Sequence, residues 1–100
     1  MKTEITRKES AVVVAIDGRL DTVHAKEFET AIAPLLQDKK IEIVVDCEKM
    51  AYISSSGLRT FMLLLKASKA NNNKLVLEKM NAEIKSVFDM TGFSNLFVIQ

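Results

Sequence analysis

The chain has 100 residues, the size of one compact domain, because a single hydrophobic core typically serves about 100 to 150 residues. Hydrophobic residues make up 48% and charged residues 27%, so the composition is that of a folded chain and excludes intrinsic disorder. Fourteen basic and thirteen acidic side chains leave a net charge of +1, which argues against binding to nucleic acid or to an anionic membrane.

The cysteine count and the N-terminus indicate the cellular compartment. Cys47 is the only cysteine, so it cannot form an internal disulfide, and the first ten residues lack the apolar stretch of a secretory signal. The longest apolar runs, 11–16 and 61–65, are far shorter than the ~18 residues that cross a bilayer. We therefore expect a cytoplasmic protein without membrane insertion.

Two strands are predicted before the first helix. The sequence TEITRK at 3–8 alternates weakly, which predicts an edge strand. The run AVVVAI at 11–16 has no polar face, which is typical of a central strand covered on both sides by helices. Residues 17–22 are predicted as a strand-to-helix loop, because a helical pattern rather than a second alternating strand follows Asp17-Gly18.

Three helices then alternate with strands. Asp21 is the candidate N-cap of the first helix, and Pro34 should kink or shorten that helix. The second helix follows a loop at 47–56 and is ended by the asparagines at 71–73, and the third begins near Asn81. The intervening and final strands are predicted at 41–47, 74–78 and 96–99.

This element order predicts the fold class. It is a single α/β domain over residues 1–100, with a mixed, mainly parallel sheet of about five strands packed against helices. In a parallel sheet, the loops that leave the carboxyl ends of the strands lie along one edge. We therefore expect the loops 17–22 and 47–56 to be neighbours and to form the functional edge.

This edge holds a run of three serines, Ser54, Ser55 and Ser56, before Gly57 and an apolar helix. The simplest interpretation is structural, with one serine as the N-cap of the helix and the glycine allowing close packing. A serine here could also act as a switch. A phosphate adds about −1.5 to −2 charges at neutral pH, and the positive end of a helix dipole tolerates that charge.

The same residues carry a resemblance to a known family. DGRLD at 17–21, the VD that ends a strand at 45–46, and YISSSGLRTFMLL at 52–64 resemble the STAS-domain family, specifically bacterial anti-sigma factor antagonists. The resemblance covers nearly the whole chain, and its most specific stretch is ISSSGL. It implies a regulatory protein of transcription that binds a kinase-type anti-sigma factor when unmodified and is released when a serine is phosphorylated.

The resemblance also implies roles for individual residues. Ser55 matches the serine that the anti-sigma kinase phosphorylates, and Asp21 matches an acidic residue that the family keeps beside it. Where the family usually has Asp before the acceptor, this chain has Ser54, which leaves Ser54 and Ser56 as alternative acceptors. Gly57 would let the kinase backbone approach closely. A Ser/Thr phosphatase is implied as the partner that reverses the modification.

Arg59 lies one helical turn after the serine loop. It could read a phosphate or an acidic partner, or it could simply be a solvated side chain. We count it with Asp21, Ser54, Ser56 and Gly57 as a predicted partner-binding residue.

Enzymatic and metal-binding functions have weaker support. A serine near His24 and Asp21 superficially suggests a nucleophile with its base, but the Gly-x-Ser-x-Gly turn of a hydrolase is absent because Ile53 occupies its first glycine position. One Cys and one His cannot build a zinc site, and no phosphate-binding glycine motif is present. We predict no enzyme activity, metal or cofactor, and we interpret His24 as a partly exposed polar residue and Cys47 as a small core residue.

One rival function shares the predicted fold. A stand-alone STAS module could bind another protein without phosphorylation, as an accessory subunit of a lipid-transport ATPase. It would use the same edge, so the sequence alone does not separate the two functions. Neighbouring genes would separate them, because a kinase-type anti-sigma gene favours the first function and transporter genes favour the second.

Overall fold

The computed structural model describes all 100 residues, and its five strands form one sheet in the order β1-β2-β3-β4-β5. The strands are β1 (Lys2–Arg7), β2 (Ala11–Leu20), β3 (Glu42–Ile53), β4 (Lys74–Glu78) and β5 (Val98–Ile99). The helices are α1 (Thr22–Ile32), α2 (Ser55–Ala70) and α3 (Ala82–Met90), with two short 3-10 helices at Ala33–Leu36 and Phe93–Asn95. β1 is antiparallel to β2, and all other pairs are parallel. The predicted α/β class, element order and edge strand are confirmed.

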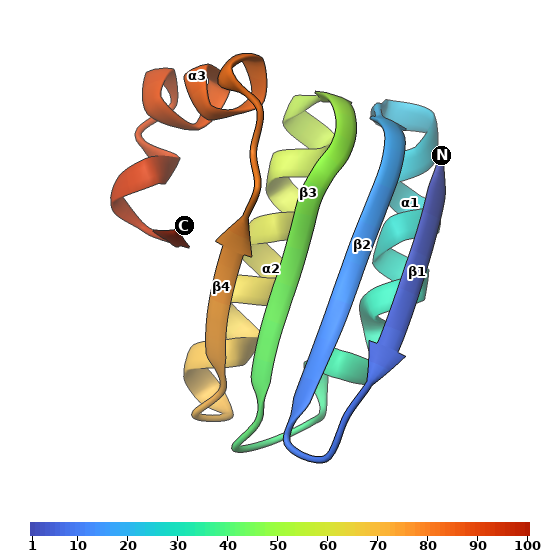
Figure 1. Ribbon diagram of the computed structural model, residues 1–100, viewed down its shortest axis with the longest axis vertical. Helices are drawn as coiled ribbons and strands as arrows, with labels where there is room; N and C mark the ends of the chain where they lie inside the picture. Colours follow the sequence, from blue (N-terminus) through green and yellow to red (C-terminus); the bar gives the residue numbers. More distant parts are fainter.

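The helices α1 and α2 lie together on one face of the sheet (Figure 1). This corrects the prediction that β2 is covered on both sides. Val12, Val14 and Ile16 are buried, but Val13 and Ala15 on the other face are only half-buried. The strand order 2-3-4 never reverses, so two right-handed crossovers place both helices on the same side.

The core lies between the sheet and these helices. Phe28 on α1 and Phe61 on α2 are fully buried, with ring centroids 5.7 Å apart. Phe88 on α3 meets Phe61 edge to face at 5.8 Å. These aromatic contacts hold α1, α2 and α3 to one core, because a buried ring contributes both apolar area and a preferred pair geometry.

Helix boundaries follow the predicted signals. Asp21 accepts a hydrogen bond from the His24 backbone N–H at 3.0 Å, and Asn81 accepts one from the Ile84 N–H at 2.9 Å. Such caps satisfy N–H groups that have no partner inside the helix. The α-helical part of the first helix ends at Ile32, and Pro34 lies in the 3-10 turn that follows, so the predicted shortening is confirmed. No helix is long and apolar enough to span a membrane.

The strands β2 and β3 extend further than predicted. We expected loops at 17–22 and 47–56, but most of these residues belong to strands. β2 continues to Leu20 and β3 continues to Ile53. The pairing shifts register between Ala15 and Asp17 and again between Gly18 and Arg19, and Gly18 takes a φ of +107° that glycine adopts readily. Because of these irregularities, Asp17 and Gly18, which resemble a turn in the sequence, lie within a continuous strand.

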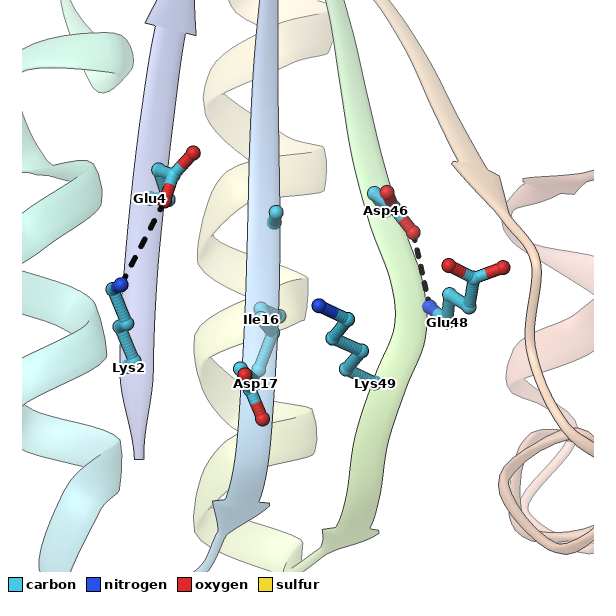
Figure 2. Close-up of a pocket in the computed structure, with 8 residues that line it drawn as sticks. Lys2, Glu4, Ile16, Asp17, Asp46, Glu48 and Lys49 are labelled. Carbon is cyan, nitrogen blue, oxygen red and sulfur yellow. Dashed lines mark hydrogen bonds and ion pairs between the residues drawn. The ribbon is translucent and has the colours of Figure 1, made fainter.

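The uncovered face of the sheet bears a shallow hollow of about 240 Å³. Figure 2 shows that charged side chains from three strands surround it, including Lys2 and Glu4 from β1, Asp17 from β2, and Asp46 from β3. The Asp46 carboxylate accepts a hydrogen bond from the Glu48 backbone N–H at 3.0 Å, where β3 departs from regular pairing. The solvated charges explain why the sequence pattern of these strand ends appears loop-like.

Candidate functional site

The ends of β2 and β3 place two helix starts side by side. Leu20 pairs with Ile53, and the next residue, Ser54, donates its backbone N–H to the Leu20 carbonyl at 2.9 Å. Asp21 follows Leu20 directly, so the N-caps of α1 and α2 are neighbours at one end of the sheet (Figure 1). The predicted adjacency of the two segments is confirmed, although strand ends rather than loops bring them together.

Ser54 is the N-cap of α2. Its hydroxyl oxygen accepts a hydrogen bond from the Gly57 N–H at 3.2 Å, and the residue is 9% exposed. The structural interpretation of one serine is therefore confirmed, and it applies to Ser54. A buried hydroxyl that already caps a helix is less accessible to a kinase than an exposed one, and the expected contact of Ser54 with a partner stays a prediction.

Ser55 is the first residue of α2 and is exposed, whereas Ser56 is half-buried. The backbone N–H groups of Ser55 and Ser56 donate no hydrogen bond within the chain, as expected in the first turn of a helix. Three consecutive serines therefore have three environments, and Ser55 presents the most accessible hydroxyl.

Gly57 lies beneath the serines and is buried. A Cβ atom added there would lie 2.9 Å from Leu20 Cγ and 3.0 Å from Ile53 Cγ1. The glycine thus lets the start of α2 approach the ends of β2 and β3. This close approach within the domain is by itself a sufficient reason for glycine at position 57, and the expected approach of a kinase backbone there stays a prediction.

Asp21 and His24 form a polar pair at the start of α1. The His24 Nδ1 atom lies 2.8 Å from Asp21 Oδ1. The hydrogen bond from the His24 backbone N–H lowers the pKa of the Asp21 carboxyl, and the His24 side chain lowers it further. Asp21 is therefore a fixed negative charge beside the serines. His24 is half-buried, as predicted, and forms no hydrogen bond with any of the three serines.

A groove of about 640 Å³ runs between α1 and α2 next to this edge. Arg59, which is exposed, lines it together with Ser56 and with Lys26 from α1. Sequence reasoning missed Val23, whose side chain on the first turn of α1 is 81% exposed. The sequence pattern could have identified Val23, because it is an apolar residue outside the helical stripe that Phe28 and Ile32 define.

Cys47 lies on the covered face of β3 and is fully buried. Burial, together with a smaller effect of the nearby carboxylates of Asp46 and Glu78, raises the pKa of its thiol to about 12. A thiol with this pKa stays protonated at neutral pH and is a poor nucleophile. The interpretation of Cys47 as a core residue is confirmed.

Comparison with known proteins agrees with this architecture. The family model for the STAS domain matches residues 2–100. The anti-sigma-B factor antagonist of Staphylococcus aureus is 30% identical over 96 residues, which cover 96% of this chain and 89% of the relative. The similarity therefore extends through nearly the whole of both proteins.

Solved structures agree on the fold. An anti-sigma factor antagonist from Mycobacterium paratuberculosis superposes with a TM-score of 0.85 at 21% identity, covering 98% of this chain and 83% of that one. The anti-sigma factor antagonist SpoIIAA superposes at 16% identity, with a TM-score of 0.77 in its unphosphorylated form, covering 99% of this chain and 87% of that one. Its phosphorylated form, from Bacillus, gives 0.76 at the same identity, covering 99% and 91%. The chain belongs to the STAS-domain family.

Proposed function

We propose that this chain is an anti-sigma factor antagonist controlled by phosphorylation of Ser55. Unmodified, it binds a Ser/Thr-kinase-type anti-sigma factor through the edge formed by Asp21, the serines and the start of α2. The kinase transfers the γ-phosphoryl group of ATP to the Ser55 oxygen, the hydroxyl loses its proton, and ADP leaves. The modified chain dissociates, and a Ser/Thr phosphatase restores it. In this scheme the domain is a binding protein, and the kinase supplies the chemistry.

The observation that carries the proposal is the exposure of Ser55 beside two serines that are less accessible. Ser54 is buried and caps the helix, and Ser56 is half-buried in the α1–α2 groove. A kinase must bring the γ-phosphate within bonding distance of the acceptor oxygen, so it needs a hydroxyl that extends from the surface. Ser55 alone satisfies that need without loss of a cap.

The fold is suited to survive the modification. A phosphate on Ser55 would lie near the free N–H groups of Ser55 and Ser56, where the helix dipole is positive. Unphosphorylated and phosphorylated SpoIIAA both superpose on this chain, with TM-scores of 0.77 and 0.76, so the same fold is found in both forms of that protein. The effect of the phosphate is therefore expected at the partner surface.

The negative charge of the phosphate explains why the modified chain would dissociate from the anti-sigma factor. The edge already carries the ionised Asp21, and Val23 offers an exposed apolar contact beside it. A dianion brought into an apolar or acidic interface adds desolvation and repulsion of several kcal/mol. A loss of about 3 to 5 kcal/mol weakens binding by two to three orders of magnitude, since each ~1.4 kcal/mol is tenfold.

Phosphorylation by the cognate anti-sigma kinase tests the site assignment. Intact-mass spectrometry after incubation with kinase and ATP should show one added phosphate on the unaltered chain and none on Ser55→Ala. Ser56→Ala is the matched control, because it removes a neighbouring hydroxyl from the same helical turn and should still gain the phosphate. A phosphate that persists in Ser55→Ala and disappears in Ser56→Ala would move the site to Ser56.

A phosphorylation-independent accessory subunit of a lipid-transport ATPase remains the second prediction. It requires stable binding to a transporter subunit whatever the state of Ser55. Co-purification from the source cells separates the two functions. A transporter ATPase bound equally by the unaltered chain and by Ser55→Asp would favour the accessory subunit, and an anti-sigma kinase bound only by the unaltered chain would favour the antagonist.

A further inference from the structure

Arg59 is the one arginine of the chain without a partner for its guanidinium group. Of the three arginines, Arg7 forms an ion pair with Asp38 at 3.0 Å, and Arg19 lies over the Tyr52 ring, 4.3 Å from its centroid. The guanidinium of Arg59 forms no ion pair and no hydrogen bond within the chain, although the residue is exposed on α2. A cation held beside the serine edge is thus free to meet a new anion.

The helix brings Arg59 and Ser55 together. The two residues are four positions apart on α2, and both are exposed. Residues at this spacing lie on one face of a helix with Cβ atoms about 5 to 6 Å apart. Long helical side chains lean toward the N-terminus, so the guanidinium of Arg59 is within reach of the turn that holds Ser55.

The surroundings of Arg59 favour an anion at this place. Arg59 and Lys26 line the groove between α1 and α2 from opposite sides, and Lys26 also has no ion-pair partner. Glu29 is the one carboxylate that lines the same groove, and it lies within ion-pair distance of neither cation. The groove therefore has a net charge of +1 before any modification.

We propose that Arg59 binds the phosphate of modified Ser55 within the same chain. A guanidinium presents a planar fork of N–H donors that matches two phosphate oxygens, which an ammonium group does not. The contact holds the phosphate against α2 and adds to the stability of the modified state. It also makes the phosphate less accessible to a phosphatase. This inference rests on the proposed modification of Ser55.

The phosphate's own titration tests the contact without a kinase. Phosphoserine is inserted at position 55 during translation, and phosphorus NMR follows the second ionisation of the phosphate with pH. A bound guanidinium favours the dianion, so the second pKa should be lower in the unaltered chain than in Arg59→Gln, by roughly half a unit or more. Arg59→Lys should give an intermediate value, because it keeps the charge and loses the fork.

Lys66→Gln is the matched control. Lys66 is exposed on α2, two turns beyond Arg59, so Lys66→Gln changes the net charge by the same amount as Arg59→Gln but leaves the surroundings of the serines unchanged. Its phosphate should titrate as in the unaltered chain. Equal titration of the unaltered chain and Arg59→Gln would overturn the inference. Failure of the kinase to modify Ser55 would overturn the proposed function instead, so the two failures are distinguishable.

Discussion

At the scale of single residues, three adjacent serines have three different roles. Ser54 caps α2, Ser55 faces solvent and Ser56 faces the α1–α2 groove. The sequence predicted the cluster and its place before a helix. It could not assign the cap, because the first helical residue depends on where β3 ends and on the backbone hydrogen bond that Ser54 donates to Leu20.

This division of roles predicts unequal costs for two alanine substitutions. Ser54→Ala removes the cap hydrogen bond to Gly57 and should lower the free energy of unfolding by about 1 kcal/mol, within a range of roughly 0.5 to 2. Ser55→Ala should change it by less than about 0.5 kcal/mol, because the hydroxyl is exposed and unbonded. Urea denaturation of both variants measures the difference, and equal losses would contradict the assignment of Ser54 as the cap.

The buried thiol of Cys47 predicts a pH dependence. The native pKa of about 12 lies above the ordinary value of 9.0, so between these values the native state holds a proton that the unfolded state has lost. The stability that Cys47 contributes is therefore complete below about pH 9 and declines as the pH rises toward about 12.

Cys47→Ala isolates this effect from other titrating groups. The substitution should flatten the decline in the free energy of unfolding between about pH 8.5 and 10.5, whatever its effect on absolute stability. Urea denaturation at several pH values provides the slopes. Parallel slopes for the unaltered chain and the variant would show that burial does not hold the thiol in its protonated form.

At the scale of elements, the start of α2 depends on a residue without a side chain. Gly57→Ala would place a Cβ atom 2.9 Å from Leu20, which is fully buried and has little room to move. Overpacking of this kind costs about 1 to 3 kcal/mol, against a gain of about 1 kcal/mol from helix propensity. We expect a net loss in urea denaturation. Ser56→Ala in the same turn is the control and should be nearly neutral, and a Gly57→Ala chain as stable as that control would contradict the tight approach.

The connection before β3 contains a second local constraint. Lys40 has a φ of +58°, a left-handed conformation that costs a residue with a Cβ atom about 1 to 2 kcal/mol. Lys40→Gly removes that cost and should raise the free energy of unfolding by up to about 1 kcal/mol after the entropy of the more flexible unfolded chain is subtracted.

Lys39→Gly is the matched control for this prediction. Lys39 is also exposed but does not have a positive φ, so glycine there should lower stability by several tenths of a kcal/mol. Thermal and urea denaturation of the two variants should therefore show changes of opposite sign. A destabilised Lys40→Gly chain would contradict the strained conformation of Lys40.

The lengths of β2 and β3 mark the limit of sequence reasoning about elements. Asp17-Gly18 and the polar residues after Cys47 resemble turns, yet both strands continue through them. Leu20, Met50 and Ile53 remain buried there, so core contacts keep the chain extended. Periodicity cannot reveal this where one face of the strand meets water and the pairing shifts register.

At the scale of the whole molecule, the strand order and the crossover rule account for the architecture. The sequence predicted three parallel strands and the adjacency of the two segments that carry Asp21 and Ser54, and both are confirmed. It did not predict that one sheet face stays uncovered. The apolar run 11–16 looks buried on both sides, but Val13 and Ala15 are shielded only by their neighbours in the sheet.

The proposed switch depends on how firmly the whole domain holds the start of α2. The start of α2 is held by the Ser54 cap, by the close contact of Gly57 with the strands, and by Phe61 in the core. A charge added at the exposed Ser55 meets a rigid scaffold, so we expect its effect in binding rather than in folding. The central claim is that phosphate on Ser55 changes affinity while the architecture stays the same.

Calorimetric titration of the cognate anti-sigma factor tests this claim most directly. The unmodified chain and the chain with phosphoserine at position 55 are compared, with circular dichroism confirming that both are folded. We predict that the modified chain binds at least about a hundredfold more weakly, which corresponds to a loss of about 3 kcal/mol or more. Equal affinities for two equally folded chains would contradict the account.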